Sequence, residues 1–340
     1  MADDAADRPR ATISDVAREA GVSKMTVSRV LNHADTVAPD TLARVQDVID
    51  RMHFRPNAIA RGLATRRTNI IGLLVYDQHE AFSFFSQMVL SAQAEAKKRG
   101  VDLLIFSLSE EQRHLSSQRL DLVDGMLCLG EVFNHAALEL LERRKVPYVV
   151  IGKRNWRNID PWYCCPDYVD GYRSVTEHLL QMGHRRIAMM GGYEDFEADI
   201  EKYVGYRQAL EAAGLPYDPA LVVYEEQHER VEAILASRRA TAVIVEGYTI
   251  LMMVLLAARA HGLRIPQDLS VVSSQVDPDA ATIYRLTGIH EMTRVHVPVR
   301  ELGMFGLALL MRRIEGEEGI PKANVLPEIF VPGESCAPPG

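Results

Sequence analysis

Short apolar runs alternate with longer amphipathic segments from residue 69 to residue 274, and this alternation constrains the fold more than any other feature. The apolar runs have the length of buried strands, and several segments between them have helical spacing. Glycines follow four helical segments, as expected where a left-handed residue ends a helix: Gly100, Gly183, Gly214 and Gly262. The pattern predicts an α/β fold of parallel sheets covered on both faces. Strands are expected over 70–75, 101–106, 125–129, 148–151, 186–190, 221–224, 242–245 and 269–274, and helices over 135–144, 169–182, 202–213, 228–237 and 249–261. This stretch exceeds one compact sheet, so we expect two lobes.

The preceding part of the chain has helical spacing instead. Its first two apolar stripes consist of Val16, Ala17 and Ala20, then Val27, Val30 and Leu31. Gly21 suits a left-handed turn between two helices, and Ser23 suits the N-cap of the second. A third helix is expected from Pro39, without a side-chain cap because Ala38 precedes it. This predicts a helix-turn-helix unit, whose second helix fits the DNA major groove. The alternative is an ordinary helical hairpin with a solvated basic face.

The charge distribution favours the first interpretation. From Arg8 to Arg67 there are 11 lysines and arginines against 6 aspartates and glutamates, a net of +5, although the whole chain carries −8. A basic head on an acidic body binds phosphates at one end and repels them elsewhere.

Other features narrow the class of protein. No run of 18 apolar residues is present, and the start, Met1-Ala2-Asp3-Asp4, lacks a signal-peptide pattern, so we expect a cytoplasmic protein without membrane contact. The cysteines have no metal-ligand spacing and predict free thiols, with adjacent Cys164 and Cys165 pointing to opposite sides of a strand, one inward and one outward. Phosphate-loop, dinucleotide, nucleophile-elbow and zinc-protease motifs are missing, so neither an enzyme nor a cofactor or metal site is expected.

Two stretches resemble one family. Residues 12–32 read Thr-Ile-Ser-Asp-Val-Ala-Arg-Glu-Ala-Gly-Val-Ser-Lys-Met-Thr-Val-Ser-Arg-Val-Leu-Asn, and residues 55–63 read Arg-Pro-Asn-Ala-Ile-Ala-Arg-Gly-Leu. At this separation they resemble the lactose-repressor (LacI/GalR) family of bacterial transcription regulators. The resemblance is specific over 12–67 and fair over the rest, where 183–188 and 268–272 are similar to recurrent family segments.

The resemblance implies the domain organisation. A helix-turn-helix domain is expected over 10–55 and a hinge helix or linker over 56–68. A two-lobed domain similar to a periplasmic binding protein, with Rossmann-like sheets, is expected over 69–333. Lobe one would comprise 69–159 plus 290–316, and lobe two 160–288 plus 317–333. The effector cleft would lie between the lobes.

The resemblance also assigns DNA contacts. Lys24, Met25 and Arg29 would face base edges, with Arg29 able to pair bidentately with guanine. Hydroxyl and amide side chains would contact phosphates, or serve only as caps or solvated groups: Thr12, Ser23, Thr26, Ser28 and Asn32. In the hinge, Asn57, Ala60 and Leu63 match residues that fold on operator DNA, where a leucine wedges into the minor groove. The alternative there is a flexible linker ending in a basic run.

The expected effector site departs from the family pattern. Lys202 replaces a usual arginine, Gly247-Tyr248 replaces Asn-Asp, and Gln275 replaces an aspartate that would bind sugar hydroxyls. The remaining candidates are mixed polar and aromatic: Asp77, His79, Phe82, Lys202, Tyr248 and Gln275. Two interpretations stay open, a pocket for a ligand unlike a common sugar, or a drifted pocket that binds nothing small. If a ligand binds, Lys202 would be its main cationic contact and would favour an anionic or hydroxyl-rich molecule.

The resulting hypothesis is a homodimeric transcription regulator, most simply a repressor. Its partners would be a pseudo-palindromic double-stranded operator and a sugar-like small effector. With a drifted pocket, the regulator would instead respond to a protein partner or to no small ligand. The last residues, 332–340, contain no leucine heptads and are expected to be a flexible tail, which favours a dimer over a tetramer.

Overall fold

In the computed structural model, residues 11–32, 34–54, 67–76, 82–108, 115, 117–129, 135–153, 158–274 and 280–340 are described. The chain divides into two compact units, residues 1–68 and 69–340.

The first unit is a three-helix domain around a small apolar core. Its elements are α1 (Ile13–Ala20), α2 (Lys24–Asn32), the 3-10 turn η1 (Ala34–Thr36) and α3 (Pro39–Arg51). The expected turn is confirmed, because Gly21 has a φ of 65° and its N–H bonds back to α1. The core consists of Val16, Ala17, Ala20, Val27, Val30, Val45, Val48, Ile49 and Phe54.

Local capping fixes where these helices begin. Thr12 and Asp15 form a reciprocal capping box at α1, and the N–H of Thr26 donates to Ser23 Oγ at 3.1 Å at the start of α2. Ala38 provides no side-chain cap for α3, as expected from the sequence.

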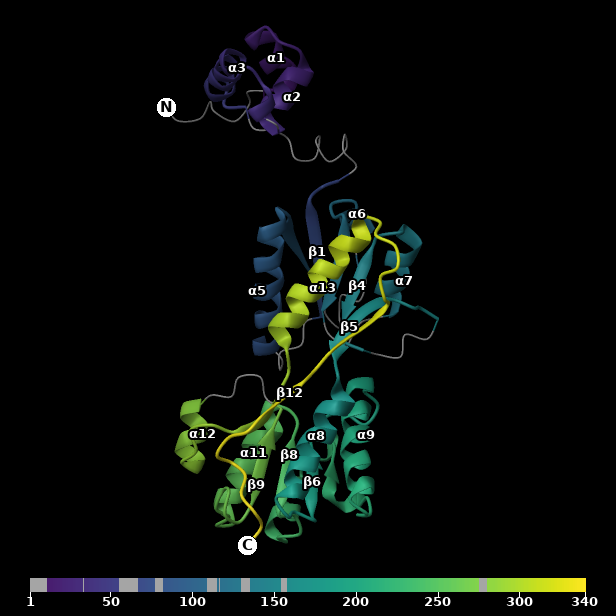
Figure 1. Cartoon of the computed structure of the whole chain (residues 1–340), viewed down its shortest axis with the longest axis vertical. Helices are drawn as coiled ribbons and strands as arrows, with labels where there is room; N and C mark the ends of the chain where they lie inside the picture. Colours follow the sequence, from purple (N-terminus) through teal and green to yellow (C-terminus); the bar gives the residue numbers. More distant parts are fainter. Residues whose placement is uncertain are drawn as a thin grey trace, which may run out of the picture. The chain divides into compact units, whose positions relative to one another are not determined.

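The second unit contains two six-stranded sheets, which Figure 1 shows in two separate lobes, each with its own helices. The first has the order β11-β5-β4-β3-β1-β2, and the second β12-β10-β9-β8-β6-β7. The neighbouring strands pair in parallel except β10 and β12, which are antiparallel. The first sheet comprises β1 (Ile70–Tyr76), β2 (Asp102–Leu108), β3 (Gly125–Leu129), β4 (Tyr148–Ile151), β5 (Trp162–Pro166) and β11 (Ala323–Leu326). The second comprises β6 (Ile187–Met190), β7 (Val222–Val223), β8 (Ala242–Val245), β9 (Ser270–Ser273), β10 (Thr293–His296) and β12 (Ile329–Val331).

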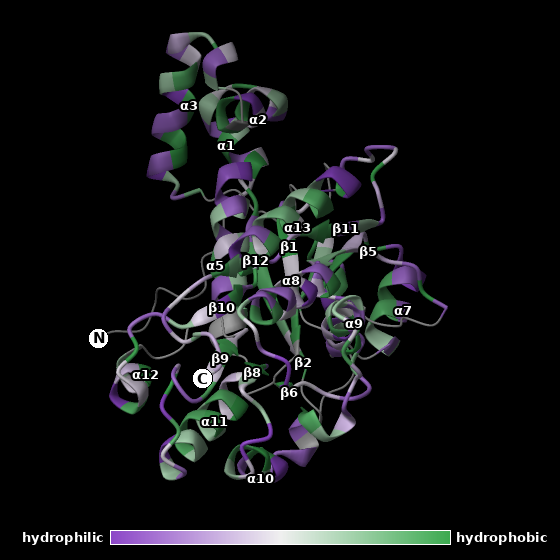
Figure 2. Ribbon diagram, turned by 60° about the horizontal axis from the view of Figure 1, so that its bottom comes forward, coloured by the Kyte–Doolittle hydropathy of each residue, from purple (hydrophilic) through white to green (hydrophobic). Residues whose placement is uncertain are grey.

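Helices bury both faces of each sheet. On the first, α5 (Phe82–Arg99) and α13 (Val299–Ile314) share one core cluster, and α7 (His135–Arg144) contributes to the opposite one; α6 is Ser117–Leu120. On the second, α10 (Arg230–Ala236), α11 (Tyr248–Ala260) and α12 (Ala280–Thr287) pack on one face, and α8 (Tyr168–Gln181) and α9 (Glu197–Ala212) on the other. The short 3-10 turns η3 (Pro219–Leu221) and η4 (Glu225–Gln227) flank β7. Figure 2 shows α11 as an apolar helix, consistent with its buried residues. The predicted α/β class is confirmed.

The lobe boundaries expected from the sequence require correction. Strand β5 pairs with β4 and therefore belongs to the first lobe, although lobe two was expected to begin at residue 160. Strand β10 belongs to the second sheet, although 290–316 was assigned to lobe one. Strand β11 lies in the first sheet, although 317–333 was assigned to lobe two. These strands are short and only partly apolar, so their pairing depends on distant partners rather than on their own pattern.

Two further expectations about single segments differ from the structure. Both Cys164 and Cys165 are buried, because helices and loops cover the two faces of β5 toward which they point. The C-terminal segment is ordered against the second sheet, not flexible. Ser335 Oγ accepts from the N–H of Thr293 at 2.8 Å and donates to the carbonyl of Val271 at 2.5 Å.

We predict that Ser335→Ala lowers the free energy of unfolding by about 1–3 kcal/mol, because the buried N–H of Thr293 loses its acceptor. Denaturant unfolding measures the change. Ser174→Ala, at a partly exposed serine of α8, is the control and should stay within about 0.5 kcal/mol of the parent. Equal stability of the two variants would show that the tail is not held by this serine.

Candidate functional site

The outward face of α2 presents a cation-rich surface. Lys24 and Arg29 are exposed, and Met25 is 66% exposed, unusual for a large apolar side chain. Val27 and Val30 point into the core and fix the rotation of the helix. The three side chains expected at base edges therefore share the solvent side of one rigid helix.

The expected phosphate contacts are in part occupied by caps. Thr12 Oγ1 donates to Asp15 at 2.7 Å, and Ser23 and Thr26 share a hydroxyl hydrogen bond of 2.9 Å. Hydroxyls can cap a helix and still accept or donate to a phosphate, so capping and DNA contact are compatible. Ser28 is half-buried, and Asn32 ends α2 with a side chain outside the described part. The hinge residues Asn57, Ala60 and Leu63 also lie outside the described residues.

A second group of polar residues lies at the carboxyl ends of β6, β8 and β9, which are neighbours in the second sheet. Glu246 follows β8, Ser274 follows β9, and Gly191-Gly192 follows β6. The N–H of Glu246 donates to the carbonyl of Met190 at 2.8 Å, so the loops stay in register beyond the strands. In parallel α/β sheets, this edge is where ligands bind.

The glycine pair allows the loop after β6 to pass close to its neighbours. Gly192 has a φ of 73°, and a Cβ there would come within 2.9 Å of Asp199 Cγ. The N–H of Tyr193 donates to Asp199 Oδ2 at 2.8 Å, which holds that carboxylate against the loop. A side chain at Gly192 would displace Asp199.

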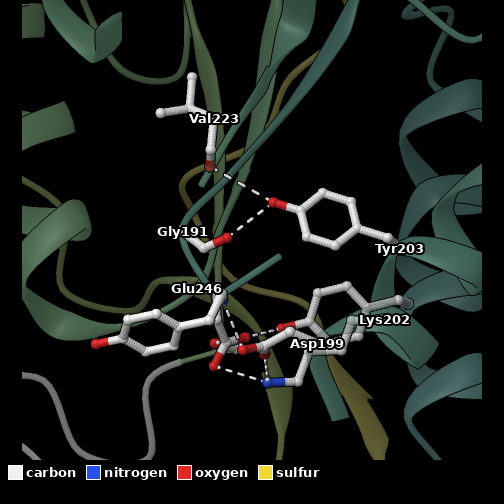
Figure 3. A network of polar contacts seen from close by, with 9 residues as sticks. Gly191, Asp199, Lys202, Tyr203, Val223 and Glu246 are labelled. Carbon is white, nitrogen blue, oxygen red and sulfur yellow. Dashed lines mark hydrogen bonds and ion pairs between the residues drawn. The ribbon is translucent and has the colours of Figure 1, made fainter. Parts of the chain in front are cut away.

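Lys202 lies between two carboxylates at this edge (Figure 3). Its Nζ is 2.8 Å from Asp199 Oδ1 and 3.1 Å from Glu246 Oε1. The rings of Tyr168 and Tyr172 lie 5.2 and 5.9 Å from the same nitrogen. Burial alone would lower the pKa of Lys202, but the two carboxylates raise it above its ordinary value, so the group stays charged.

Glu246 connects this ion pair to two more elements. Its Oε2 accepts a hydrogen bond from Ser274 Oγ at 2.6 Å and another from the hydroxyl of Tyr172 in α8. Burial, together with the nearby Glu246 charge, raises the pKa of the Tyr172 hydroxyl well above its ordinary value, so this tyrosine acts as a donor. Tyr203, from α9, donates to the carbonyl of Gly191 at 2.8 Å (Figure 3).

A third carboxyl group, Glu328, borders the cluster from the segment between β11 and β12. Its residue is 9% exposed, and neither of its oxygens has a hydrogen-bond partner. It packs against Gly171 of α8, where a Cβ would collide with it. Burial is the main cause that raises the pKa of Glu328 to about 8, opposed by Lys202 and assisted by Glu246 and Asp167.

The cluster changes the role expected for Lys202. Two carboxylates neutralise its charge, so it has no net positive charge to offer an anionic ligand. The paired geometry therefore does not support the anion preference expected for Lys202.

Of the other residues expected at the effector site, only Tyr248 is fully described in the structure. Tyr248 begins α11 and is 41% exposed, beside Glu246 in the chain. Asp77, His79 and Gln275 lie outside the described residues, and Phe82 begins α5 with a side chain outside them.

Sequence reasoning missed Asp199, Glu246 and Glu328. A signal existed for the first, because Asp199 and Lys202 are three residues apart on one helix and so lie on one face. Glu246 directly follows an apolar strand, a position that also points to a binding edge. Nothing local marks Glu328.

Comparison with known proteins identifies the family of this chain. Residues 12–57 match the family "Bacterial regulatory proteins, lacI family", and residues 176–336 match "Periplasmic binding protein-like domain". The HTH-type transcriptional regulator CelR of Thermobifida fusca is 33% identical over 336 residues, covering 94% of this chain and 96% of its own. The chain belongs to the LacI family.

Solved structures of LacI-family proteins are also similar to this chain. A CelR–cellobiose complex is 30% identical, with a TM-score of 0.66, and covers 96% of this chain and 100% of its own. The lac repressor dimer bound to operator and the anti-inducer ONPF has a TM-score of 0.79 at 21% identity, over 97% of this chain and 100% of its own, and so supports the fold. This LacI-family chain has relatives that are transcriptional regulators, not enzymes.

Two kinds of site are absent from the described residues. In that part of the chain no helix is long and apolar enough to cross a bilayer. Within the same residues no group of three or more histidine, cysteine, aspartate or glutamate side chains is placed to hold a metal ion.

We predict that Lys202→Met lowers the free energy of unfolding by about 3–5 kcal/mol, because Asp199 and Glu246 lose their shared counter-charge. Thermal or denaturant unfolding measures this without any ligand. Lys98→Met, at a largely exposed lysine of α5, should change stability by less than about 0.5 kcal/mol. A stable Lys202→Met protein would contradict the structural role assigned to this lysine.

Glu328 should make the free energy of unfolding depend on pH. Its folded pKa of about 8 lies above the ordinary value of 4.5, so the folded state holds the extra proton between these values. The stabilising contribution is therefore full below pH 4.5 and is lost as the pH rises through 8. We predict that the wild type loses stability from pH 6.5 to pH 9 more steeply than Glu328→Gln, in denaturant titrations at both pH values. Parallel curves would show that Glu328 does not bind a proton on folding.

Proposed function

We propose that this LacI-family chain is a homodimeric repressor that binds a pseudo-palindromic operator and whose operator affinity changes when a small molecule binds its second unit. The observation that carries the DNA-binding part is the face of α2. A basic and apolar triplet, Lys24, Met25 and Arg29, is exposed on a helix whose opposite side is locked into a core. Such a face suits base edges and phosphates. A regulator of bacterial DNA would act in the cytoplasm.

Exposed apolar side chains support the dimer. Leu90 of α5, Leu256 of α11 and Tyr284 of α12 are 62, 52 and 48% exposed. These surfaces suit a second copy of the chain, and a two-fold dimer would present two recognition helices to two half-sites.

The effector site is proposed at the carboxyl edge of the second sheet, on Glu246 and the adjoining Tyr248. Support comes from the convergence of three strand ends on one polar network that reaches solvent through Glu246, whose side chain is 22% exposed. Asp77, His79, Phe82 and Gln275 remain proposed members of this site. Regulation by a protein partner, with no small ligand, is the alternative that a ligand screen would support by returning nothing.

We predict that Arg29→Ala removes sequence discrimination, at a cost of about 1–3 kcal/mol for the specific operator, because a bidentate arginine–guanine contact is lost. Operator selection from random DNA followed by competition binding measures it. Arg51→Ala, where the arginine is paired with Asp47 and Glu19 on the side of α1 and α3, should keep wild-type selectivity. Wild-type selectivity in Arg29→Ala would refute the assignment of α2 as the recognition helix.

A further inference from the structure

The cluster at the carboxyl edge of the second sheet has more acidic than basic groups. Asp199, Glu246 and Glu328 act on a single ammonium, that of Lys202. Lys153, the next lysine toward this region, is paired with Glu201 of α9. If all three acids were ionised with Lys202 charged, the cluster would hold two surplus negative charges.

Titratable groups from three elements surround Glu328. From α8 come Asp167, which caps the helix, and the Tyr172 hydroxyl; from α9 comes Lys202; from the end of β8 comes Glu246. Only Lys202 among these described groups favours the ionised form of Glu328, while Glu246 and Asp167 oppose it. Glu328 is therefore protonated at neutral pH, and the remaining cluster still lacks one positive charge.

Glu328 provides an observation independent of the acidic composition. Both of its oxygens are buried without a hydrogen-bond partner, a state that costs free energy unless something else supplies a counter-charge or a donor. Its carboxyl group lies against Gly171 of α8, within electrostatic range of Lys202 and Glu246. A buried carboxyl without a hydrogen-bond partner beside this cluster is a group that an added positive charge would stabilise in its ionised form.

Access to the cluster is through Glu246. Its side chain is 22% exposed, against 11% for Lys202 and 9% for Asp199. Two exposed tyrosines belong to the same loops: Tyr248, 41% exposed, begins α11 two residues after Glu246, and Tyr193, 38% exposed, binds Asp199 through its backbone N–H. Tyrosine rings attract cations as well as sugar faces.

We propose that the effector of this site carries a positively charged amine, as an amino sugar or related amine does, and that this amine docks on Glu246 and offsets the surplus negative charge of the cluster. The inference rests on the proposed effector function of the same edge. Neutral sugars would bind more weakly, and phosphorylated or acidic sugars would be repelled.

A proton should leave the site when the amine binds. A sugar amine is only about half protonated at pH 7.5, so the release is measured at pH 6.5, where the free amine already carries its proton. The added positive charge there favours ionised Glu328, and a fraction of one proton per subunit is released. A neutral sugar would bind without this release. Proton release therefore separates a cationic ligand from any ligand that merely fits.

The test uses the full-length protein and matched sugar triplets that differ in one substituent. Glucosamine, glucose and glucose 6-phosphate form one set, and galactosamine, galactose and galactose 6-phosphate another. Thermal shift ranks them, and calorimetry at pH 6.5 in phosphate and in MES buffer, neither of which is a primary amine, gives affinity and proton release. We expect an amine to bind at least tenfold more tightly than its neutral partner, with proton release.

Three variants locate the effect. Glu246→Gln should bring the amine within about threefold of its neutral partner, because the group that meets the amine is neutral. Glu328→Gln should keep the amine preference but lose proton release. Glu177→Gln, at a carboxylate paired with Arg173 on α8, is the control and should behave as wild type. Circular dichroism confirms that each variant is folded, and if Glu246→Gln unfolds, Glu328→Gln alone decides.

The outcomes are separable from those of the proposed function. Tighter binding of neutral or phosphorylated sugars, binding of no amine in either set, or amine binding without proton release would overturn the inference. Wild-type operator binding together with such a result would leave the regulator function intact. Loss of that function would instead appear as unchanged DNA selectivity in Arg29→Ala.

Discussion

One ammonium group held between two carboxylates organises the carboxyl edge of the second sheet. Lys202 and Asp199 come from α9, and Glu246 comes from the end of β8. Burying three charges is costly unless each is partnered, so the helix and the strand end are held at one separation by this requirement. Glu246 extends the constraint to α8 through Tyr172 and to β9 through Ser274. Charge pairing, more than apolar packing, therefore sets the geometry where a ligand would bind.

The parts of the fold that the sequence predicted well are those determined within a few residues. The turn at Gly21, the cap at Ser23 and the uncapped start at Ala38 depend only on local backbone and side-chain geometry. The strands over 125–129, 148–151 and 242–245 and the helix over 135–144 have the expected bounds, because continuous apolar runs or helical spacing mark them. Helix α9 begins at Glu197, earlier than the expected residue 202, since its first turn is acidic and lacks an apolar stripe.

The parts that the sequence did not predict depend on partners far away in the chain. Strands β5, β10, β11 and β12 are short and partly exposed, so their sheet is decided by the strand beside them. The same holds for the candidate site. Lys202 was identified as a ligand contact through resemblance, but its two carboxylate partners became visible only when α9 and β8 were placed together. Glu328 has no local signal at all, because its burial results from the packing of a short connection against Gly171.

The short connection between β11 and β12 limits how the two lobes of the second unit can move. Leu326 ends an edge strand of the first sheet and Ile329 begins an edge strand of the second, so the two sheets are joined there by Pro327 and Glu328 alone. A fully extended chain of this length spans about 11 Å at most. The chain also crosses between the sheets at Asp167, between β5 and α8, and at Val297-Pro298, between β10 and α13, so three short connections together limit any separation of the lobes. Since Glu328 is half of one of these connections, a change in its charge acts on a segment whose two ends are fixed, one in each sheet.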